Sequence, residues 1–339
     1  MSAIDTTLKD AIGMQTNKGI LAWLLSRQVF WIFLATVVAC IALSVLTDSF
    51  DTPRNIYNVS RNFAFVGIIA LGMTAVIICG GIDLSVGSTV LISAMVTTMT
   101  MHWGAPLWIG LPAGIAAGTL VGLINGFLIA YAGMQPFVVT LGMMSIARSL
   151  GMVLSNNQLI SSFGPDSKLL FAVGGGAINI GTVPIPTPVV VLIVLAIITA
   201  FLFRWTRWGR YLYAIGGNEK AAILTGVPVR LVKLSVYAFV GFLASVTGFL
   251  ELGWLGTVST GLGNGMELTV IAATVIGGAN LAGGIGTAFG AVIGAALIEV
   301  IRNSLILLGV STFWHGTFVG TFIVLAVAFD RLRDKETGE

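Results

Sequence analysis

Apolar stretches of membrane-spanning length recur along the whole chain and constrain its fold more than any other feature. Crossing about 30 Å of hydrocarbon takes roughly 20 apolar residues of α-helix, because each residue advances the helix by about 1.5 Å. Ten stretches are candidates, of which the eighth is too short to span alone: residues 30–46, 63–79, 84–101, 107–131, 137–154, 189–203, 234–252, 268–280, 287–308 and 318–329. We therefore expect an all-α, polytopic integral membrane protein with about ten transmembrane helices, forming a single domain over residues 1–339.

The composition excludes an ordinary soluble domain. Of the 339 residues, 56% are hydrophobic and only 9% are charged, and the mean hydropathy is +0.99. Soluble domains carry about 25% charged residues. The net charge of +3 does not indicate nucleic-acid binding, because the basic residues cluster at the chain ends and in one loop. The two cysteines, Cys40 and Cys79, lie in apolar stretches, so we expect neither a disulfide framework nor a metal site.

Lysine and arginine residues predict the orientation, because the short cytoplasmic loops of membrane proteins carry an excess of them. The connection 204–233 holds six basic residues against the single acid Glu219, so we expect it to be cytoplasmic. The N-terminal segment 1–28 and the tail 330–339 each carry three lysine or arginine residues, and an even number of crossings puts both on the cytoplasmic side. The long connection 155–188 then lies outside.

Two apolar stretches are interrupted by similar glycine-rich segments. The first break, residues 80–87, reads GGIDLSVG, and the second break, residues 277–284, reads GGANLAGG. Interrupted helices at corresponding places in two halves of a membrane protein point to a path for a solute. The candidate hinge or path residues are Gly80, Gly81, Asp83, Ser85, Gly87, Gly277, Gly278, Asn280, Gly283 and Gly284.

A second pair of similar segments is GTLVGLING at 118–126 and GTAFGAVIG at 286–294. The two pairs are separated by different lengths of chain, so a duplication without gaps does not explain both. Small residues spaced four apart also occur wherever membrane helices pack closely, and this reading stays open for the second pair.

Asp83 has three possible roles in the first break. It could be the N-cap of a helix that begins at Leu84, accepting a hydrogen bond from the amide of Ser85 or Val86. It could carry a coupling proton, or it could accept hydrogen bonds from sugar hydroxyls. The corresponding residue of the second break is Asn280, which also caps helices well but does not titrate. Capping explains both residues, so we favour it.

The basic connection contains a short helix signal. Asn218 follows a Gly-Gly turn and is a suitable N-cap for a helix that ends at Gly226, since Pro228 prevents its continuation. Its small alanine face suits docking against another protein. The alternative is an interfacial helix that has no partner.

Four separated motifs carry a resemblance to a known family. They are GGIDLSVGS at 80–88, QPFVVTLGMMSIARSLG at 135–151, AIGGNEKAAILTGV at 214–227 and VIGGANLAGGIGTAFGAVIGA at 275–295. Together they closely resemble the permease subunits of ABC sugar importers of the ribose and xylose type, and the likeness runs from about residue 62 to the final span.

The resemblance implies a homodimer of permeases in the bacterial inner membrane, served by a periplasmic sugar-binding protein and a cytoplasmic ATPase. ATP and Mg²⁺ would bind to that ATPase, and this chain would bind no cofactor. The segment that would couple the two subunits comprises Gly217, Asn218, Glu219, Lys220, Ala221, Ala222 and Gly226. The family pattern has a glutamate directly before the two alanines, whereas this chain has Lys220 there and Glu219 one residue earlier, which puts the contact of Glu219 in doubt.

Energy for transport must come from elsewhere, because no Gly-Lys dipeptide and hence no P-loop occurs in the chain. The alternative to a partner ATPase is an ion-coupled carrier, which needs ionisable residues inside the membrane. Besides Asp83, the candidates are Arg148, Glu299 and Arg302, of which the last two are spaced to form an ion pair within one helix. An intramembrane enzyme is the least favoured alternative, since no nucleophile–base or metal-ligand pattern appears.

Two acids and several tryptophans flank the external ends of predicted spans. Glu251 and Glu267 are candidates for docking the sugar-binding protein. Tryptophans such as Trp254 could stack on a pyranose ring, but residues of this type more often anchor span ends at the interface. The transported solute is expected to be a monosaccharide or related polyol, with specificity residing in the receptor.

Overall fold

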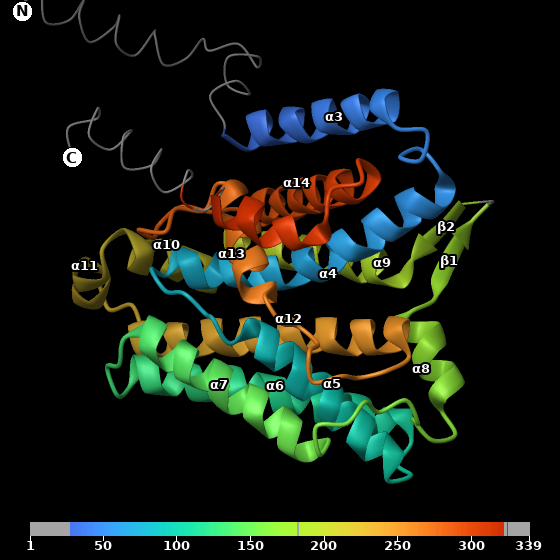
Figure 1. The fold of residues 1–339 in the computed structure, drawn as a ribbon. Helices are drawn as coiled ribbons and strands as arrows, with labels where there is room; N and C mark the ends of the chain where they lie inside the picture. The colour runs from blue at the N-terminus through green and yellow to red at the C-terminus, as the bar shows by residue number, and fades with distance from the viewer. Residues whose placement is uncertain (1–27, 182, 322–323, 325–339) are drawn as a thin grey trace, which may run out of the picture.

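The computed structural model describes residues 28–181, 183–321 and 324, and this part of the chain is dominated by helices (Figure 1). The helices are α3 (Gln28–Leu46), α4 (Pro53–Ile78), α5 (Val86–His102), α6 (Leu107–Ala130), α7 (Pro136–Leu154), α8 (Ser167–Gly174), α9 (Thr187–Trp205), α10 (Arg207–Gly217), α11 (Glu219–Leu224), α12 (Val229–Leu255), α13 (Met266–Ile276) and α14 (Ala288–Leu307). A 3-10 helix, η1 (Thr312–Trp314), follows α14.

The predicted apolar stretches coincide with helices up to residue 308. Seven helices of the described residues are long and apolar enough to cross a membrane, and α5 and α13 are shorter apolar helices. The prediction of an all-α polytopic membrane protein is confirmed. The tenth predicted stretch, 318–329, is described only in part, and the predicted cytoplasmic segments 1–28 and 330–339 lie outside the described residues apart from Gln28.

The long connection 155–188 contains structure that the sequence analysis missed. It folds into α8 and an antiparallel hairpin of β1 (Ala177–Ile180) and β2 (Val183–Pro186). A glycine turn at Gly181, with φ of +63°, between two short strand-forming segments is the signal that predicts such a hairpin.

Helix α4 lies at the centre of the bundle, whereas α3 stands at its edge (Figure 1). From Ala64 to Ile78 α4 is buried continuously, which suits its Gly-, Ala- and Ile-rich sequence. Helix α3 is mostly exposed apart from its side toward α14, as expected of a helix that faces lipid.

Close packing of α6 on α12 explains the first of the similar glycine segments. A Cβ on Gly122 would overlap the backbone of Tyr237, and one on Gly126 would lie 2.9 Å from Leu234 Cα. In α14, a Cβ on Gly294 would likewise overlap the backbone of Ala273 in α13. Both segments therefore serve helix–helix contact, the role that spacing of small residues by four predicts.

Candidate functional site

Both breaks begin with the same helix-ending motif. After α4, Gly80 has a φ of +74°, its amide donates to Ile77 O (2.8 Å) and the next amide, of Gly81, donates to Val76 O (2.9 Å). After α13, Gly278 has a φ of +93°, its amide donates to Val275 O (2.9 Å) and the next amide donates to Thr274 O (3.1 Å). This is the Schellman arrangement, and it requires a residue that tolerates positive φ. The two Gly-Gly pairs therefore differ in which glycine has the positive φ. In the first break it is the first glycine, Gly80, and in the second break it is the second glycine, Gly278.

Asp83 stabilises the turn in the first break through hydrogen bonds to Ser85. The residue is buried, and its Oδ1 accepts hydrogen bonds from the amide (2.8 Å) and the hydroxyl (2.6 Å) of Ser85. Asn125 of α6 donates to the same hydroxyl at 2.9 Å. The predicted bond to the Ser85 amide is present, but α5 begins at Val86 with Ser85 as its N-cap residue. Asp83 therefore forms a turn ahead of the helix and is not the N-cap that we predicted.

Asn280 is not an N-cap either. Its Oδ1 accepts from the amide of Ala282 at 2.8 Å, which forms a local turn. Helix α14 begins later, at Ala288, and its N-cap is Thr287, whose hydroxyl accepts from the amide of Gly290 at 3.0 Å. The predicted stretch 287–308 therefore located α14 correctly, but the residue that caps it is Thr287 and not Asn280.

The two breaks touch each other. The amide of Gly284 donates to the carbonyl of Ile78, the last residue of α4, at 2.9 Å. A Cβ on Gly283 would lie 3.3 Å from the Cα of Gly80. Segments roughly two hundred residues apart in sequence thus meet, a contact that neither segment predicts by itself.

The end of α10 lies against both breaks. A Cβ on Gly216 would overlap the Ile78 carbonyl and the Gly284 amide, so only glycine fits there. The hydroxyl of Tyr213 donates to Gly286 O at 2.8 Å, and burial raises the pKa of this phenol above its ordinary value. Sequence reasoning missed α10, although Trp208, Leu212 and Ile215 follow the spacing of an amphipathic helix.

The coupling segment forms the short helix that the sequence predicts. Helix α11 is capped by Asn218, whose Oδ1 accepts from the Ala221 amide at 3.0 Å, and Gly226 follows with a φ of +81°. Glu219 is engaged inside the chain, with both carboxylate oxygens 2.8 Å from Lys233 Nζ.

The surface of α11 differs from the expected alanine face. Ala222 is buried against the bundle, whereas Ala221 is exposed. The exposed apolar side chains are Ile223 (57%) and Leu224 (87%). The sequence analysis passed over these two residues, although apolar side chains at the end of a short polar helix are a signal of contact with another surface.

The segment 256–265, which we call the inward loop, runs back along the bundle from the end of α12 to α13 (Figure 1). Nη1 of Arg148 holds it by donating to Thr260 O (3.1 Å) and Leu262 O (2.7 Å). Gly263, with a φ of +70°, packs directly on the backbone of Gly87 at the start of α5. The connection between α12 and α13 therefore reaches the end of the first break.

The two acids that were candidates for docking the sugar-binding protein lie inside the chain. Glu251 is only 8% exposed. Glu267 is half-buried, and a Cβ on Gly87 would lie 2.6 Å from its Oε2. Neither carboxylate stands out on the surface as a docking charge must, and docking through them is not supported.

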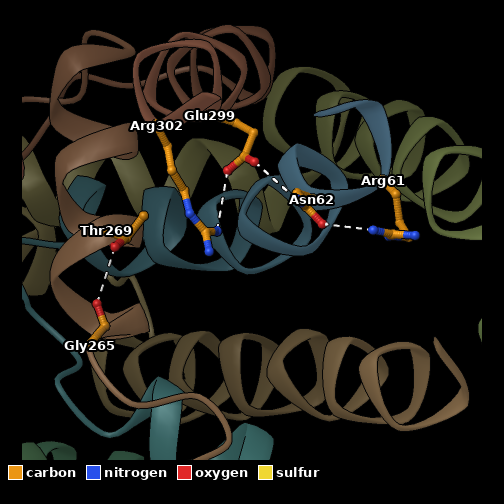
Figure 2. A network of polar contacts seen from close by, with 6 residues as sticks. All are labelled: Arg61, Asn62, Gly265, Thr269, Glu299 and Arg302. Carbon is orange, nitrogen blue, oxygen red and sulfur yellow. Dashed lines mark hydrogen bonds and ion pairs between the residues drawn. The ribbon is translucent and has the colours of Figure 1, made fainter. Parts of the chain in front are cut away.

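Glu299 and Arg302 form the predicted ion pair within α14. Arg302 Nη1 lies 3.6 Å from Glu299 Oε2, and Asn62 Nδ2 donates to Glu299 Oε1 at 3.1 Å (Figure 2). The neighbouring Arg61 stacks its guanidinium 3.8 Å from the centre of the Trp254 ring. Glu299 and Arg302 are paired with each other, which does not favour either of them as the carrier of a coupling ion.

Comparison with known proteins gives a consistent result. The family model described as branched-chain amino acid transport system / permease component matches residues 55–327. The ribose import permease protein of Escherichia coli strain K12 is 35% identical over 309 residues, covering 91% of this chain and 94% of its own length. That of Bacillus subtilis strain 168 is 37% identical over 299 residues, covering 88% and 91%.

A relative named for another sugar is similarly close. The xylose transport system permease protein of Haemophilus influenzae is 35% identical over 368 residues, covering 91% of this chain and 97% of its own length. No solved structure matches the chain.

Proposed function

The chain belongs to the family of branched-chain amino acid transport system permease components, and we propose that it carries a monosaccharide such as ribose, xylose or allose across the bacterial inner membrane. It is the multi-pass permease subunit of an ABC sugar importer and not itself an enzyme. An ATPase subunit and a substrate-binding protein are its partners. ATP and Mg²⁺ bind to the ATPase, and two copies of this chain form the pathway.

The observation that carries this proposal is the contact between α10 and both breaks. Only the extended residue Asn218 separates the end of α10 at Gly217 from the start of α11 at Glu219, so a displacement of α11 acts on Gly216 through two residues. Gly216 in turn touches the Ile78 carbonyl and the Gly284 amide. A movement of α11 caused by the ATPase would therefore displace the residues at which the two breaks contact each other.

The arrangement of the ends supports the proposed orientation. Helices α10 and α11 lie at one end of the bundle, and α8 with the β1–β2 hairpin lies at the opposite end (Figure 1). With the basic connection 204–233 in the cytoplasm, the hairpin faces the periplasm and both termini are cytoplasmic. The exposed side chains of Ile223 and Leu224 then face the ATPase.

Reconstitution tests the energy source. We expect purified importer in proteoliposomes to take up sugar only when ATP and the binding protein are both supplied. Uptake by the permease alone, driven by an imposed proton or sodium gradient without ATP, would contradict the proposal and favour the ion-coupled carrier.

A substitution in the coupling segment tests the docking site. Gly226 has a positive φ and open space around it, so Gly226→Asp places a charge beside α11 without filling a cavity. We expect the variant permease to remain folded but to lose co-purification of the ATPase. Gly181→Asp, at a positive-φ glycine in open space on the hairpin side, is the matched control and should retain the ATPase. Unchanged co-purification in Gly226→Asp would count against docking there.

A further inference from the structure

A cavity of about 670 Å³ lies at the end of the bundle away from α11. It is open to the surface, and its lining comes from Val66 of α4, the last turns of α12, the inward loop, α13, α14 and residues 315–319. Its polar and aromatic lining residues include Glu251, Trp254, Asn264, Glu299, Arg302 and His315. Figure 2 shows Glu299 and Arg302 on α14, on the same side of the bundle as Gly265 and Thr269. The volume lies within the range of small-molecule sites, which is about 300 to 1,000 Å³.

Two polar side chains of this cavity lack partners in the part of the chain that the structure describes. Glu251 is more than nine-tenths buried, and its carboxylate makes no hydrogen bond there. The Nε2 of His315 is buried and likewise without a hydrogen-bond partner. Buried polar atoms are nearly always paired, so an acceptor and a ring nitrogen left open toward one cavity point to a polar ligand.

The other groups define what that ligand is. Arg302 pairs with Glu299 and also interacts electrostatically with Glu251, so the lining carries charges of both signs, which disfavours a strongly charged solute. Asn264 is exposed toward the cavity, and its amide both donates and accepts. Hydroxyl groups do the same, so a neutral polyhydroxylated molecule satisfies this mixture best.

An aromatic face completes the lining. The Trp254 ring is 38% exposed and is held in place by Arg61 on its face and by Phe65, whose ring centre lies 5.9 Å away. A fixed indole beside a carboxylate offers an apolar surface for the C–H face of a sugar ring next to an acceptor for its hydroxyls.

The breaks lack such a site. The cavity beside Gly80 and Gly81 measures about 20 Å³, which is room for water only. The carboxylate of Asp83 accepts hydrogen bonds from Ser85, and the side chain of Asn280 accepts one from the Ala282 amide in a local turn. A sugar molecule therefore does not fit beside Asp83, and the hypothesis that Asp83 binds sugar hydroxyls is not supported.

We propose that the cavity lined by Glu251, Trp254 and Asn264 is the transit site where the permease holds the sugar, with the Glu251 carboxylate accepting hydrogen bonds from its hydroxyls. This inference rests on the proposed function and adds the site of contact. The two breaks then act as hinges and do not touch the solute.

The first experiment measures the number of sugar molecules imported per ATP hydrolysed. The complete importer is assayed in proteoliposomes with radiolabelled D-ribose, D-xylose and D-allose, and Glu251→Gln is compared with wild type. Glutamine keeps the shape and replaces one carboxyl oxygen by an amide group, so we expect the ratio to fall about tenfold, roughly the contribution of one hydrogen bond to the sugar. Receptor-stimulated ATP hydrolysis should stay within about twofold, because the coupling end is untouched.

The matched control is Thr247→Val, which removes a buried hydroxyl one turn earlier on α12, outside the cavity. It should leave the ratio unchanged. An unchanged ratio in Glu251→Gln overturns the transit site. Absence of uptake by the wild-type importer with all three sugars contradicts the proposed function instead, so the two failures are distinguishable.

The second experiment does not depend on transport, so it tests the transit site even if the Glu251→Gln permease fails to assemble. Asn264→Cys is made in a chain in which Cys40 and Cys79 are alanine, and is labelled from outside with a membrane-impermeant maleimide. We expect labelling, and at least a threefold slower rate with binding protein plus the imported sugar than with binding protein alone. Gln158→Cys, on the exposed external connection, should show no effect of sugar. Equal rates at Asn264→Cys with and without sugar overturn the assignment.

Discussion

The two breaks begin alike and end differently. Each starts with a helix closed by the Schellman motif, with the glycine at positive φ supplied by Gly80 in one and Gly278 in the other. The first break then returns to helix at Val86 and is fixed by buried side chains. The second continues to Ala288 and contains two more glycines at positive φ, Gly283 (+99°) and Gly284 (+77°).

This difference suggests that the first break is rigid and that the second break is flexible. The Ser85 hydroxyl donates to Asp83 and accepts from Asn125 of α6, which ties the first break to that helix. The second break is held mostly by backbone contacts, such as that of Gly284 with Ile78, and by the hydroxyl of Tyr213. We expect substitutions in the first break to affect folding and those in the second to affect transport.

The largest effect is expected for Asp83→Leu. Leucine leaves the Ser85 amide and hydroxyl without their acceptor in a buried site, and hydrogen bonds to charged groups are worth about 1.5–3 kcal/mol each. The yield of folded permease should fall by about tenfold or more, measured by size-exclusion chromatography in detergent. Asp83→Asn keeps an acceptor of the same shape and should retain near-normal yield and uptake.

The matched variant in the second break is Asn280→Leu. Asn280 is half-buried and accepts a single amide, that of Ala282, so its yield should fall less than twofold. Equal losses in Asp83→Leu and Asn280→Leu would remove the distinction between the two breaks. Loss of uptake in a well-folded Asp83→Asn would instead indicate a role for the charge.

An intermediate effect is expected for Gly284→Ala, which tests the compliance of the second break. A residue with a Cβ costs about 1–2 kcal/mol at positive φ, and here the Cβ also lies 3.3 Å from the Gly217 amide nitrogen. ATP-driven uptake should fall about fivefold to tenfold while the melting temperature drops by only a few degrees.

Gly104→Ala is the control for backbone strain alone. Gly104 has a φ of +93° in open space between α5 and α6, away from both breaks. It should lower the melting temperature by a similar amount and leave uptake per folded molecule unchanged. If Gly104→Ala and Gly284→Ala reduce uptake equally, strain and not the position explains the effect.

The sequence predicted the elements better than the way they meet. Apolar length located the helices, and the Asn218 cap with Gly226 located α11, because both depend on local physics. The start of α5 was placed too early, at Leu84 instead of Val86, and neither Asp83 nor Asn280 is an N-cap, since both side chains form local turns that compete with capping.

Contacts between distant segments were beyond local pattern reasoning. The Gly284–Ile78 hydrogen bond, the packing of Gly263 on Gly87 and the burial of Glu251 each depend on how the bundle assembles. Glu251 was therefore predicted to be an external charge, whereas in the structure it is buried and lines the same cavity as the inward loop.

The smallest expected effect distinguishes the two tyrosines that reach the breaks. Tyr213 donates to Gly286 O in the second break at 2.8 Å, whereas Tyr237 lies 3.4 Å from Ile82 O in the first. A neutral hydrogen bond contributes about 1 kcal/mol, and the longer contact contributes less. Tyr213→Phe should therefore lower sugar imported per ATP about twofold to fivefold, and Tyr237→Phe should leave it within experimental error.

The pH dependence gives this prediction a second readout. Because burial raises the pKa of Tyr213 above its ordinary value, the phenol stays protonated and able to donate throughout the pH range in which the importer is assayed. The difference between wild type and Tyr213→Phe should be the same at pH 6 and pH 8, measured in the same proteoliposomes. A difference that disappears at either pH would mean that another titrating group, and not this hydrogen bond, links α10 to the second break.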